Sequence, residues 1–288
     1  MSRLQNGDIP YRIFMHKERE EFTMSLFKKF AATTMALTMA FSLAACGGSA
    51  DTTTEGEDTA DTSTGKTYVI GTDTTFAPFE FTTESGEFVG IDIDLMNAIA
   101  EDQGFQVEFN SLGFNAAVQA LEVGQVDGVI AGMSITDERK EKFDFSDPYF
   151  DSGVVMGIKA DNEEIKGYED LAGKTVAVKI GTEGQAFAES IKDQYGFETR
   201  TFDDSNNMYM DVNSGNSAAC FEDYPVMGYA ISQGVGLKMV TEKENGNSYG
   251  FAVNKGENTE LLEMFNAGLA NLKENGTYDE ILNKYIEE

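Results

Sequence analysis

The stretch Lys66-Thr-Tyr-Val-Ile-Gly-Thr72 decides the fold, because a variant of it returns as Lys174-Thr-Val-Ala-Val-Lys-Ile-Gly-Thr182. Each copy is an apolar run that ends in Gly-Thr, and such a run predicts a buried strand. A second unit is also repeated: a helical pattern, a glycine and a short apolar run occur at 114–131 and again before Phe221. Together the repeats predict two lobes built on one local plan.

Strand-like and helix-like patterns alternate along the rest of the chain. Helical spacing of apolar residues marks 92–100, 114–123, 261–272 and 278–286, and strand-like runs mark 68–71, 106–109, 129–131 and 248–253. Asp92 is expected to cap the first of these helices. The alternation is typical of α/β folds with largely parallel sheets. Ligands of such folds bind at the carboxyl ends of the strands, so the cleft between the lobes is the expected site.

The N-terminal part has the pattern of a secreted lipoprotein. Residues 24–45 read as a signal peptide, in which two lysines precede an apolar run that is short for a membrane span. The run ends in Leu43-Ala-Ala-Cys46, which resembles the bacterial lipobox. Cys46 would then be lipidated as the first residue of the mature protein. Residues 1–23 fit no targeting pattern and are expected to be an upstream extension from a misassigned start.

The segment 46–65 is expected to be a flexible linker. It is built mainly from Gly, Ser, Thr, Ala, Asp and Glu and contains no aromatic residue. Such a composition cannot bury enough apolar surface to fold. The linker would hold the folded part, about 66–288, away from a membrane surface.

Composition excludes several classes of function. The net charge of −29 argues against a nucleic-acid partner, which requires a basic footprint. The only histidine, His16, lies in the leader, so the mature chain cannot form a histidine-dependent triad or zinc site. Cys220 has no cysteine partner once Cys46 is lipidated, and it is expected to be a buried thiol. The glycines form no phosphate-binding loop, and no cofactor or metal is expected.

Arg139 is the residue with the clearest chemical potential. It lies a few residues past the apolar run 129–131, in Ala131-Gly-Met-Ser-Ile-Thr-Asp-Glu-Arg-Lys140. A guanidinium presents a planar set of donors that matches a carboxylate edge to edge. The residues alone leave two interpretations open: Arg139 binds a ligand's carboxylate, or it pairs with a neighbour such as Asp137 or Glu138.

Five motifs in order resemble the polar amino-acid family of bacterial extracellular solute-binding proteins (family 3), the substrate receptors of ABC importers. The motifs are Gly71-Thr-Asp-Thr-Thr-Phe-Ala-Pro-Phe79, Gly90-Ile-Asp-Ile-Asp-Leu95, Ile130-Ala-Gly-Met-Ser-Ile-Thr-Asp-Glu-Arg139, Phe143-Asp-Phe-Ser-Asp147 and Glu274-Asn-Gly-Thr-Tyr-Asp279. The resemblance covers nearly all of 66–288, and the glutamine-binding members look most similar.

This resemblance implies an α/β fold of the periplasmic-binding-protein-like type II: a two-lobe Venus flytrap whose second lobe interrupts the first. Lobe 1 is expected at 66–152 and 250–288, and lobe 2 at 153–249. Two hinge strands are expected near Phe150–Gly153 and Ser248–Gly250. The resemblance also implies a monomeric, lipid-anchored extracellular receptor without enzymatic activity, which delivers a free amino acid to the permease subunits of an ABC transporter.

The resemblance further assigns a clamp for a zwitterion. Arg139 matches the family's arginine that binds the α-carboxylate. The Gly132 backbone, the Ser134 hydroxyl and Thr182, at an expected helix start, would assist it. Asp223 matches the acid that binds the α-ammonium group. Because Arg139 lies in lobe 1 and Asp223 in lobe 2, only a closed form would complete the clamp.

The remaining site residues concern the ligand's side chain. Phe76 and Phe114 match the aromatic walls around its aliphatic stem. Asp73 and Lys179 match the groups that recognise its polar end. A carboxylate and an ammonium group suit an amide, which has both a donor and an acceptor, so glutamine is favoured.

Two residues depart from the glutamine-binding pattern. Glu183 and Glu222 would add negative charge at the pocket and make a cationic ligand, arginine or lysine, the alternative. A less favoured alternative is a dehydratase of small carboxylates on a related fold, with Glu183 or Glu222 as the catalytic acid.

Overall fold

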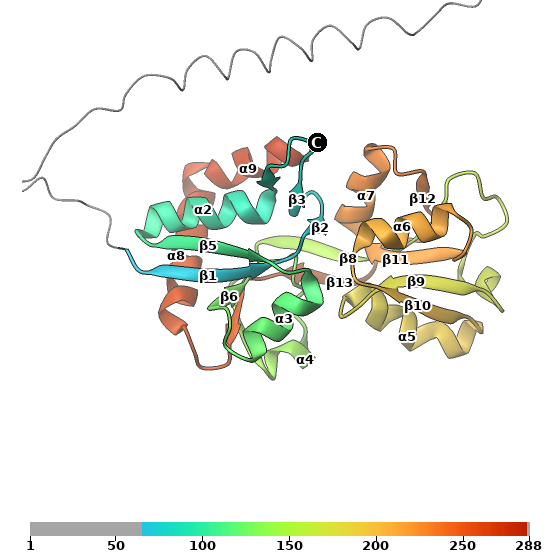
Figure 1. Ribbon diagram of the computed structural model, residues 1–288, viewed down its shortest axis with the longest axis horizontal. Coiled ribbons are helices and arrows are strands. Elements are labelled where there is room, and N and C mark those ends of the chain that lie inside the picture. Colours follow the sequence, from blue (N-terminus) through green and yellow to red (C-terminus); the bar gives the residue numbers. More distant parts are fainter. Residues whose placement is uncertain (1–64, 287–288) are drawn as a thin grey trace, which may run out of the picture. The chain divides into compact units, whose positions relative to one another are not determined.

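The computed structural model describes residues 65–286, which form two large β-sheets and one small sheet, all with helices packed nearby (Figure 1). The predicted extension, the signal peptide, the lipidation site Cys46 and the linker before residue 65 lie outside the described residues. Among the helices of 65–286, none is long and apolar enough to cross a membrane.

The first large sheet has five strands in the order β5-β1-β6-β14-β7. β1 is parallel to β5 and β6, whereas β14 is antiparallel to β6 and β7. The first copy of the repeated segment is β1, and its apolar residues are largely buried, as predicted. The strand bounds are β1 (Thr67–Thr72), β5 (Gln106–Ser111), β6 (Gly128–Val129), β7 (Phe143–Phe145) and β14 (Ala252–Asn254).

Helices cover both faces of this sheet. Tyr68 and Ile70 of β1 pack into one apolar cluster with α2, α8 and α9, whereas Val69 packs into another with α3. Successive strand residues point to opposite faces, so these two clusters lie on opposite sides of the sheet. The bounds are α2 (Ile91–Gln103), α3 (Phe114–Glu122), α4 (Asp137–Lys140), α8 (Thr259–Asn275) and α9 (Thr277–Tyr285). The long helices confirm the helical patterns expected from the sequence.

The second large sheet has the order β10-β9-β11-β8-β12, with β13 paired to β8. The second copy of the repeat is β9, an interior strand that is parallel to β10 and β11, while β8 is antiparallel to β11, β12 and β13. The strand bounds are β8 (Phe150–Lys159), β9 (Thr175–Lys179), β10 (Glu198–Phe202), β11 (Ala219–Asp223), β12 (Leu237–Met239) and β13 (Glu244–Tyr249).

This sheet is also covered on both faces. Val176 and Val178 pack with residues of α5, and Ala177 packs with residues of α6 and α7. Cys220 is fully buried on the α6 and α7 side as a free thiol, which confirms the prediction. The helices are α5 (Glu183–Tyr195), α6 (Ser205–Asn213) and α7 (Tyr224–Ser232), with a short 3-10 turn at Tyr168–Leu171.

Two strands carry the chain between the large sheets. β8 follows β7 of the first sheet and enters the second, and β13 leads back to β14 of the first. They pair side by side, with Tyr249 opposite Phe150 and Ser248 opposite Asp151. The segments expected to form the hinge, Phe150–Gly153 and Ser248–Gly250, therefore lie next to each other where the chain crosses.

A small three-stranded sheet follows β1 and precedes α2. Its strands are β2 (Thr75–Phe76), β3 (Glu80–Thr82) and β4 (Phe88–Val89). The expectation that Asp92 caps α2 is wrong. The N-cap is Gly90 without a side-chain cap bond, and Asp92 is a fully buried residue of the first turn. Its carboxylate accepts hydrogen bonds from other segments, so tertiary packing has replaced the local cap.

Candidate functional site

A narrow cavity receives side chains from both large sheets and the segments that follow their strands. Eight of the nine ligand-binding residues expected from the sequence line it; Asp73 does not. Ala131 and Glu183 complete the lining. The full set is Phe76, Phe114, Ala131, Gly132, Ser134, Arg139, Lys179, Thr182, Glu183 and Asp223.

The topology explains this convergence. The segments that follow β1, β5 and β6 bring in the residues of the first sheet, and the ends of β9 and β11 bring in those of the second. Within each sheet these strands are parallel, so their carboxyl ends meet at one edge. Residues far apart in the sequence therefore share one cavity.

Arg139 is held over the cavity by short-range structure. It lies in α4, where the Thr136 hydroxyl accepts a hydrogen bond from the Arg139 amide at 3.2 Å. Its guanidinium donates to the Ser134 carbonyl at 2.8 Å and to the Gly181 carbonyl at 3.0 Å. Burial lowers the pKa of Arg139, yet arginine stays protonated at neutral pH. The side chain thus offers a fixed positive charge to the cavity.

The partner of Arg139 is not the one that local sequence suggests. Asp137 pairs with Lys140, whereas Arg139 lies 3.7 Å from Glu183 and stacks at 5.3 Å over the ring of Phe114. Glu183 therefore does contribute negative charge at the cavity, as the sequence predicts. The guanidinium and this carboxylate come from different sheets' helices, α4 and α5.

Asp223 forms the opposite pole. It ends β11 and is almost fully buried, and burial is the main reason why its pKa is raised to about 7. The hydroxyl of Tyr249 donates to Asp223 Oδ2 at 2.5 Å, and Ser152 Oγ donates to the Tyr249 oxygen at 3.0 Å. Asp223 precedes α7 but makes no side-chain cap bond, so its carboxylate is available to the cavity. A nearby cation would favour its ionised form.

Tyr249 is a further candidate site residue, which the sequence patterns did not single out. It is fully buried at the end of β13, and its hydroxyl orients the carboxylate of Asp223. Its position in a predicted hinge strand is the only sequence signal. The residue that it contacts lies on another strand and is distant in the chain, so only the fold brings them together.

Lys179 and Asp73 form a buried ion pair. Both side chains are about 1% exposed, and the Lys179 ammonium also lies 4.6 Å from the centre of the Phe76 ring. Burial alone would lower the pKa of Lys179, but the carboxylates of Asp73 and Glu222 outweigh it and the pKa is raised. Lys179 lines the cavity while Asp73 lies behind it. Asp73 was expected to face the ligand together with Lys179; here its carboxylate pairs with Lys179, and its role toward a ligand stays a prediction.

Glu222 is not at the cavity, although the sequence predicts it there. Its Oε2 accepts hydrogen bonds of 2.9 Å from Ser205 and Tyr209. Neighbouring residues of a strand point to opposite faces, so Glu222 turns away from the cavity that Asp223 lines. Its charge still acts on two cavity residues: it raises the pKa of Lys179 and that of Asp223.

Two expected donors to a ligand carboxylate are already engaged. The Gly132 amide donates to Asp92 Oδ2 at 2.8 Å, and Ser134 Oγ donates to Asn247 Oδ1 at 3.1 Å. Thr182 is the N-cap of α5, as predicted, and its hydroxyl accepts from the Gln185 amide at 3.3 Å. The N-terminus of α5 therefore faces the cavity, and its partial positive charge suits an anion.

The cavity is narrow. Its free volume is about 10 Å³, roughly the space that one water occupies. Pockets for small organic ligands are about 300–1,000 Å³. The walls must move apart before an organic ligand can enter.

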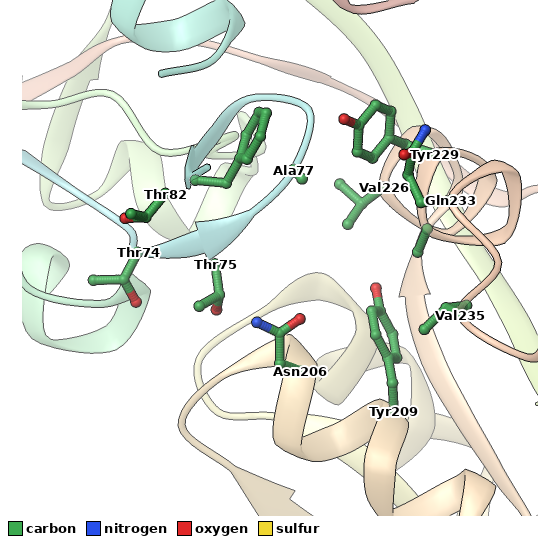
Figure 2. A pocket seen from close by; sticks show the side chains of 12 residues that line it. Thr74, Thr75, Ala77, Thr82, Asn206, Tyr209, Val226, Tyr229, Gln233 and Val235 are labelled. Atoms are coloured by element: carbon green, nitrogen blue, oxygen red, sulfur yellow. The ribbon is translucent and has the colours of Figure 1, made fainter. Parts of the chain in front are cut away.

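A larger cavity of about 580 Å³ lies between the small sheet and helices α6 and α7 (Figure 2). Thr75 lines this cavity, whereas Phe76, the next residue of β2, lines the narrow one. Every residue that lines the larger cavity is uncharged. The larger cavity therefore has no charged side chain to pair with the two charges of a zwitterion. The narrow cavity has two cationic and two acidic side chains, so it is the candidate site.

Comparisons with known proteins agree with this geometry. Residues 68–288 match the family model of the bacterial extracellular solute-binding proteins, family 3. An arginine-binding periplasmic protein of Mannheimia haemolytica is 34% identical over 76% of this chain and 90% of its own length.

Solved structures of two proteins are similar to the chain. One is the second substrate-binding domain of GlnP from Lactococcus lactis in an open conformation, with 44% identity, a TM-score of 0.56, and coverage of 77% of this chain and 96% of that chain. The other is an ancestral arginine-binding protein. Its glutamine-bound structure has 41% identity and a TM-score of 0.71, with coverage of 77% and 98%, and its arginine-bound structure has the same identity and a TM-score of 0.72.

Proposed function

Because this chain belongs to the bacterial extracellular solute-binding proteins, family 3, we propose that it binds one free polar L-amino acid, with glutamine favoured. Its fold is the two-lobe, type II fold of periplasmic binding proteins. In this proposal the protein delivers the amino acid to the permease subunits of an ABC importer.

One observation carries the proposal: Arg139 and Asp223 line the same cavity. An amino acid carries a carboxylate and an ammonium group on one carbon, so it needs one fixed cation and one carboxylate within a short span. Arg139 and Asp223 also act on each other's ionisation, which places them within electrostatic reach. The α-carboxylate would bind Arg139 and the N-terminus of α5 at Thr182, and the α-ammonium would bind Asp223.

Hinge motion is part of the proposal. We propose lobe boundaries at 152/153 and 249/250, so that β8 and β13 form the hinge. The contact between Arg139 and the Gly181 carbonyl and the pair of Lys179 with Asp73 both join the first sheet's residues to the second's. These contacts would separate to admit the ligand and form again around it. The open conformation of the GlnP domain supports such a motion.

The identity of the ligand rests on Lys179. Lys179 lines the cavity, and its ammonium lies over Phe76, which with Phe114 would enclose an aliphatic stem. An ammonium donor repels a cationic side chain and donates to an amide oxygen. The glutamine-bound structure of the ancestral protein supports this choice.

A cationic amino acid, arginine or lysine, is the second candidate. The specific observation in its favour is the carboxylate of Glu183 at the cavity. Names of relatives point the same way, since the Mannheimia haemolytica protein is described as arginine-binding and the ancestral protein also binds arginine. A cationic ligand would have to displace Lys179 from the cavity or pair with Glu183.

We propose that binding occurs without turnover. A dehydratase would need a protonated acid beside a leaving group, and Glu183 is instead paired with Arg139. Product formation from a cyclohexadienyl acid would support the enzyme. We further propose that the protein is a monomer, secreted and anchored to the outer side of the cell membrane through a lipid on Cys46.

Calorimetric titration of the purified protein with each standard amino acid tests the function. The chain has no tryptophan, so heat is a better signal than intrinsic fluorescence. Glutamine is expected to bind at one site per chain and to raise the unfolding temperature, since ligand at 100 times its Kd adds about 2.7 kcal/mol to stability. Tighter binding of arginine or lysine would favour the second candidate. Failure of every amino acid to bind would refute the proposal.

A further inference from the structure

Behind the candidate site lies a buried pair of carboxyl groups, Glu80 and Asp92. Glu80 begins β3 and Asp92 lies in the first turn of α2, and both are fully buried. Asp92 Oδ2 accepts two hydrogen bonds of 2.8 Å, from the Gly132 amide and from the Tyr149 hydroxyl. Gly132 lines the cavity, so only this residue separates Asp92 from the cavity.

The unpaired oxygen atoms of this pair indicate that one of the two carboxyl groups carries a proton. Asp92 Oδ1 and both carboxyl oxygens of Glu80 are buried and lack a donor when both groups are ionised. The two residues lie on adjacent segments, since the Asp92 amide donates a 2.9 Å hydrogen bond to the carbonyl of Phe79, the residue before Glu80. One proton on Glu80, donated to Asp92 Oδ1, satisfies an oxygen of each group and removes the repulsion between two buried charges.

The surroundings favour Glu80 as the proton carrier. Asp92 receives two donors, which stabilise its ionised form, whereas Glu80 receives none among the described residues. The other ionisable groups that face the pair are Asp73, Lys179 and Tyr149, and Lys179 is already paired with Asp73. Lys179 is therefore not free to neutralise Glu80.

The bond from Gly132 fixes part of the cavity wall. In a trans peptide the carbonyl points away from the N–H, so the Ala131 carbonyl points away from Asp92. Ala131 and Gly132 both line the cavity, and Asp92 does not. Gly132 has a φ of +53°, and a Cβ on it would lie 2.3 Å from the Phe76 ring. The positive φ and the close Phe76 ring restrict the backbone at Gly132, and the hydrogen bond to Asp92 fixes its peptide group on the side away from the cavity.

We propose that Glu80 and Asp92 share one proton, with Glu80 protonated and Asp92 charged, and that this pair is the positioning device that holds the Ala131–Gly132 peptide in the wall of the amino-acid site. The inference rests on the proposed function. A peptide oxygen on the cavity side and a buried negative charge behind it both favour a ligand's ammonium group.

The variants Glu80→Gln, Glu80→Leu and Asp92→Asn separate the roles of the two carboxyls. The amide of Glu80→Gln supplies the same donor to Asp92 as a protonated carboxyl, whereas Glu80→Leu supplies none. Asp92→Asn keeps an acceptor for Gly132 but removes the charge. Glu84→Gln, in the exposed turn after β3, is the matched control.

The first measurement is made without ligand, by infrared spectroscopy at neutral pH. The carbonyl stretch of a protonated carboxyl is expected in the wild-type protein and in Glu84→Gln. Asp223, with a pKa of about 7, contributes part of this band, and Asp223→Asn identifies that part by removing it. The remaining part is expected to be absent in Glu80→Gln. Its absence from the wild-type spectrum would overturn the shared proton, whatever the ligand proves to be.

The second measurement is the Kd for the amino acid that binds best. Glu80→Leu and Asp92→Asn are each expected to weaken binding roughly tenfold or more, the effect of losing a hydrogen bond to a charged group. Glu80→Gln is expected to restore what Glu80→Leu loses, which a merely structural role would not predict. The assignment would be overturned if Glu80→Gln and Glu80→Leu lost the same affinity. It would also be overturned if Asp92→Asn bound the amino acid strongly while Glu80→Gln bound it weakly. If the wild-type protein bound no amino acid, the proposed function would fail. The infrared band would still show whether Glu80 and Asp92 share a proton.

Discussion

Tyr249 donates a 2.5 Å hydrogen bond to Asp223, and this bond joins the end of β13 to the end of β11. One residue lies on a strand that crosses between the sheets, and the other is the carboxylate proposed to bind the ligand's ammonium group. The pair therefore links the orientation of a binding group to the position of the proposed hinge.

Tyr249→Phe is expected to weaken amino-acid binding roughly tenfold, because the hydroxyl both orients Asp223 and stabilises its ionised form. Calorimetric titration at neutral pH measures the change. Tyr195→Phe, at the end of α5, is the control and is expected to bind normally. An unchanged Kd in Tyr249→Phe would remove Tyr249 from the site.

Amino-acid binding is expected to depend on pH through Asp223. Its pKa is about 7, raised mainly by burial, and only the ionised form pairs with an ammonium group. Affinity should therefore fall as the pH drops below this pKa, by up to about tenfold per pH unit. Titrations on both sides of pH 7 measure the slope, and Asp223→Asn should bind weakly at every pH. A flat profile for the wild-type protein would contradict the role of Asp223.

The same pKa shift has the opposite effect on stability without ligand. The pKa of Asp223 is 3.8 in its unperturbed state and about 7 when folded, so the folded state holds a proton that the unfolded state has lost. The resulting stability is present below pH 3.8 and is lost as the pH rises through 7. Above pH 7, Asp223→Asn is expected to unfold at a higher temperature than the wild-type protein. Each kcal/mol gained in the free energy of unfolding should raise the unfolding temperature by roughly 2–4 °C. Thermal unfolding against pH tests this, and a lower unfolding temperature for the variant at high pH would contradict it.

Arg139→Ala is expected to abolish detectable binding while the fold stays intact. Arg139→Lys keeps the charge but loses the planar pair of donors, so binding should weaken by roughly ten- to a hundredfold. Calorimetry measures binding and circular dichroism checks the fold. Arg200→Ala, an exposed arginine that pairs with Asp211, is the control. An Arg139→Ala protein that binds as tightly as the wild type would refute the clamp.

The buried pair of Lys179 and Asp73 is expected to act as a unit. Asp73→Asn or Lys179→Met alone leaves a buried charge without its partner and should cost roughly 3–5 kcal/mol of stability. The double variant should recover most of this loss, and denaturant unfolding of all four proteins measures the coupling. Lys179→Met should also lower the preference for glutamine over arginine. Additive losses in the double variant would contradict the pairing.

Local patterns in the sequence predicted the secondary structure well. The repeated segment became β1 and β9, and the helical spacing of apolar residues marked α2, α3, α8 and α9. These features follow from neighbours in the chain, because burial of one face imposes a period on the sequence. Eight of the expected site residues line one cavity for a related reason: the motifs place them at the ends of parallel strands.

The errors concern side chains whose partners are distant in sequence. Asp92 looked like a helix cap but binds Gly132, and Glu222 looked like a cavity residue but binds Ser205 and Tyr209. Tyr249 gave no signal beyond its position in a predicted hinge strand. Each case depends on which segments the fold brings together.

The sequence by itself determined the class of this protein: an acidic α/β chain whose single histidine is His16, with a repeated strand, one arginine within a motif, and the family that these residues indicate. Only the tertiary structure decided which charges meet. Carboxylates and cations are buried only where a partner offsets the loss of hydration, and those partners come from other strands and helices. Arg139 and Asp223 become two poles of one cavity, and Glu80 and Asp92 become a pair, because two sheets deliver them to the same place.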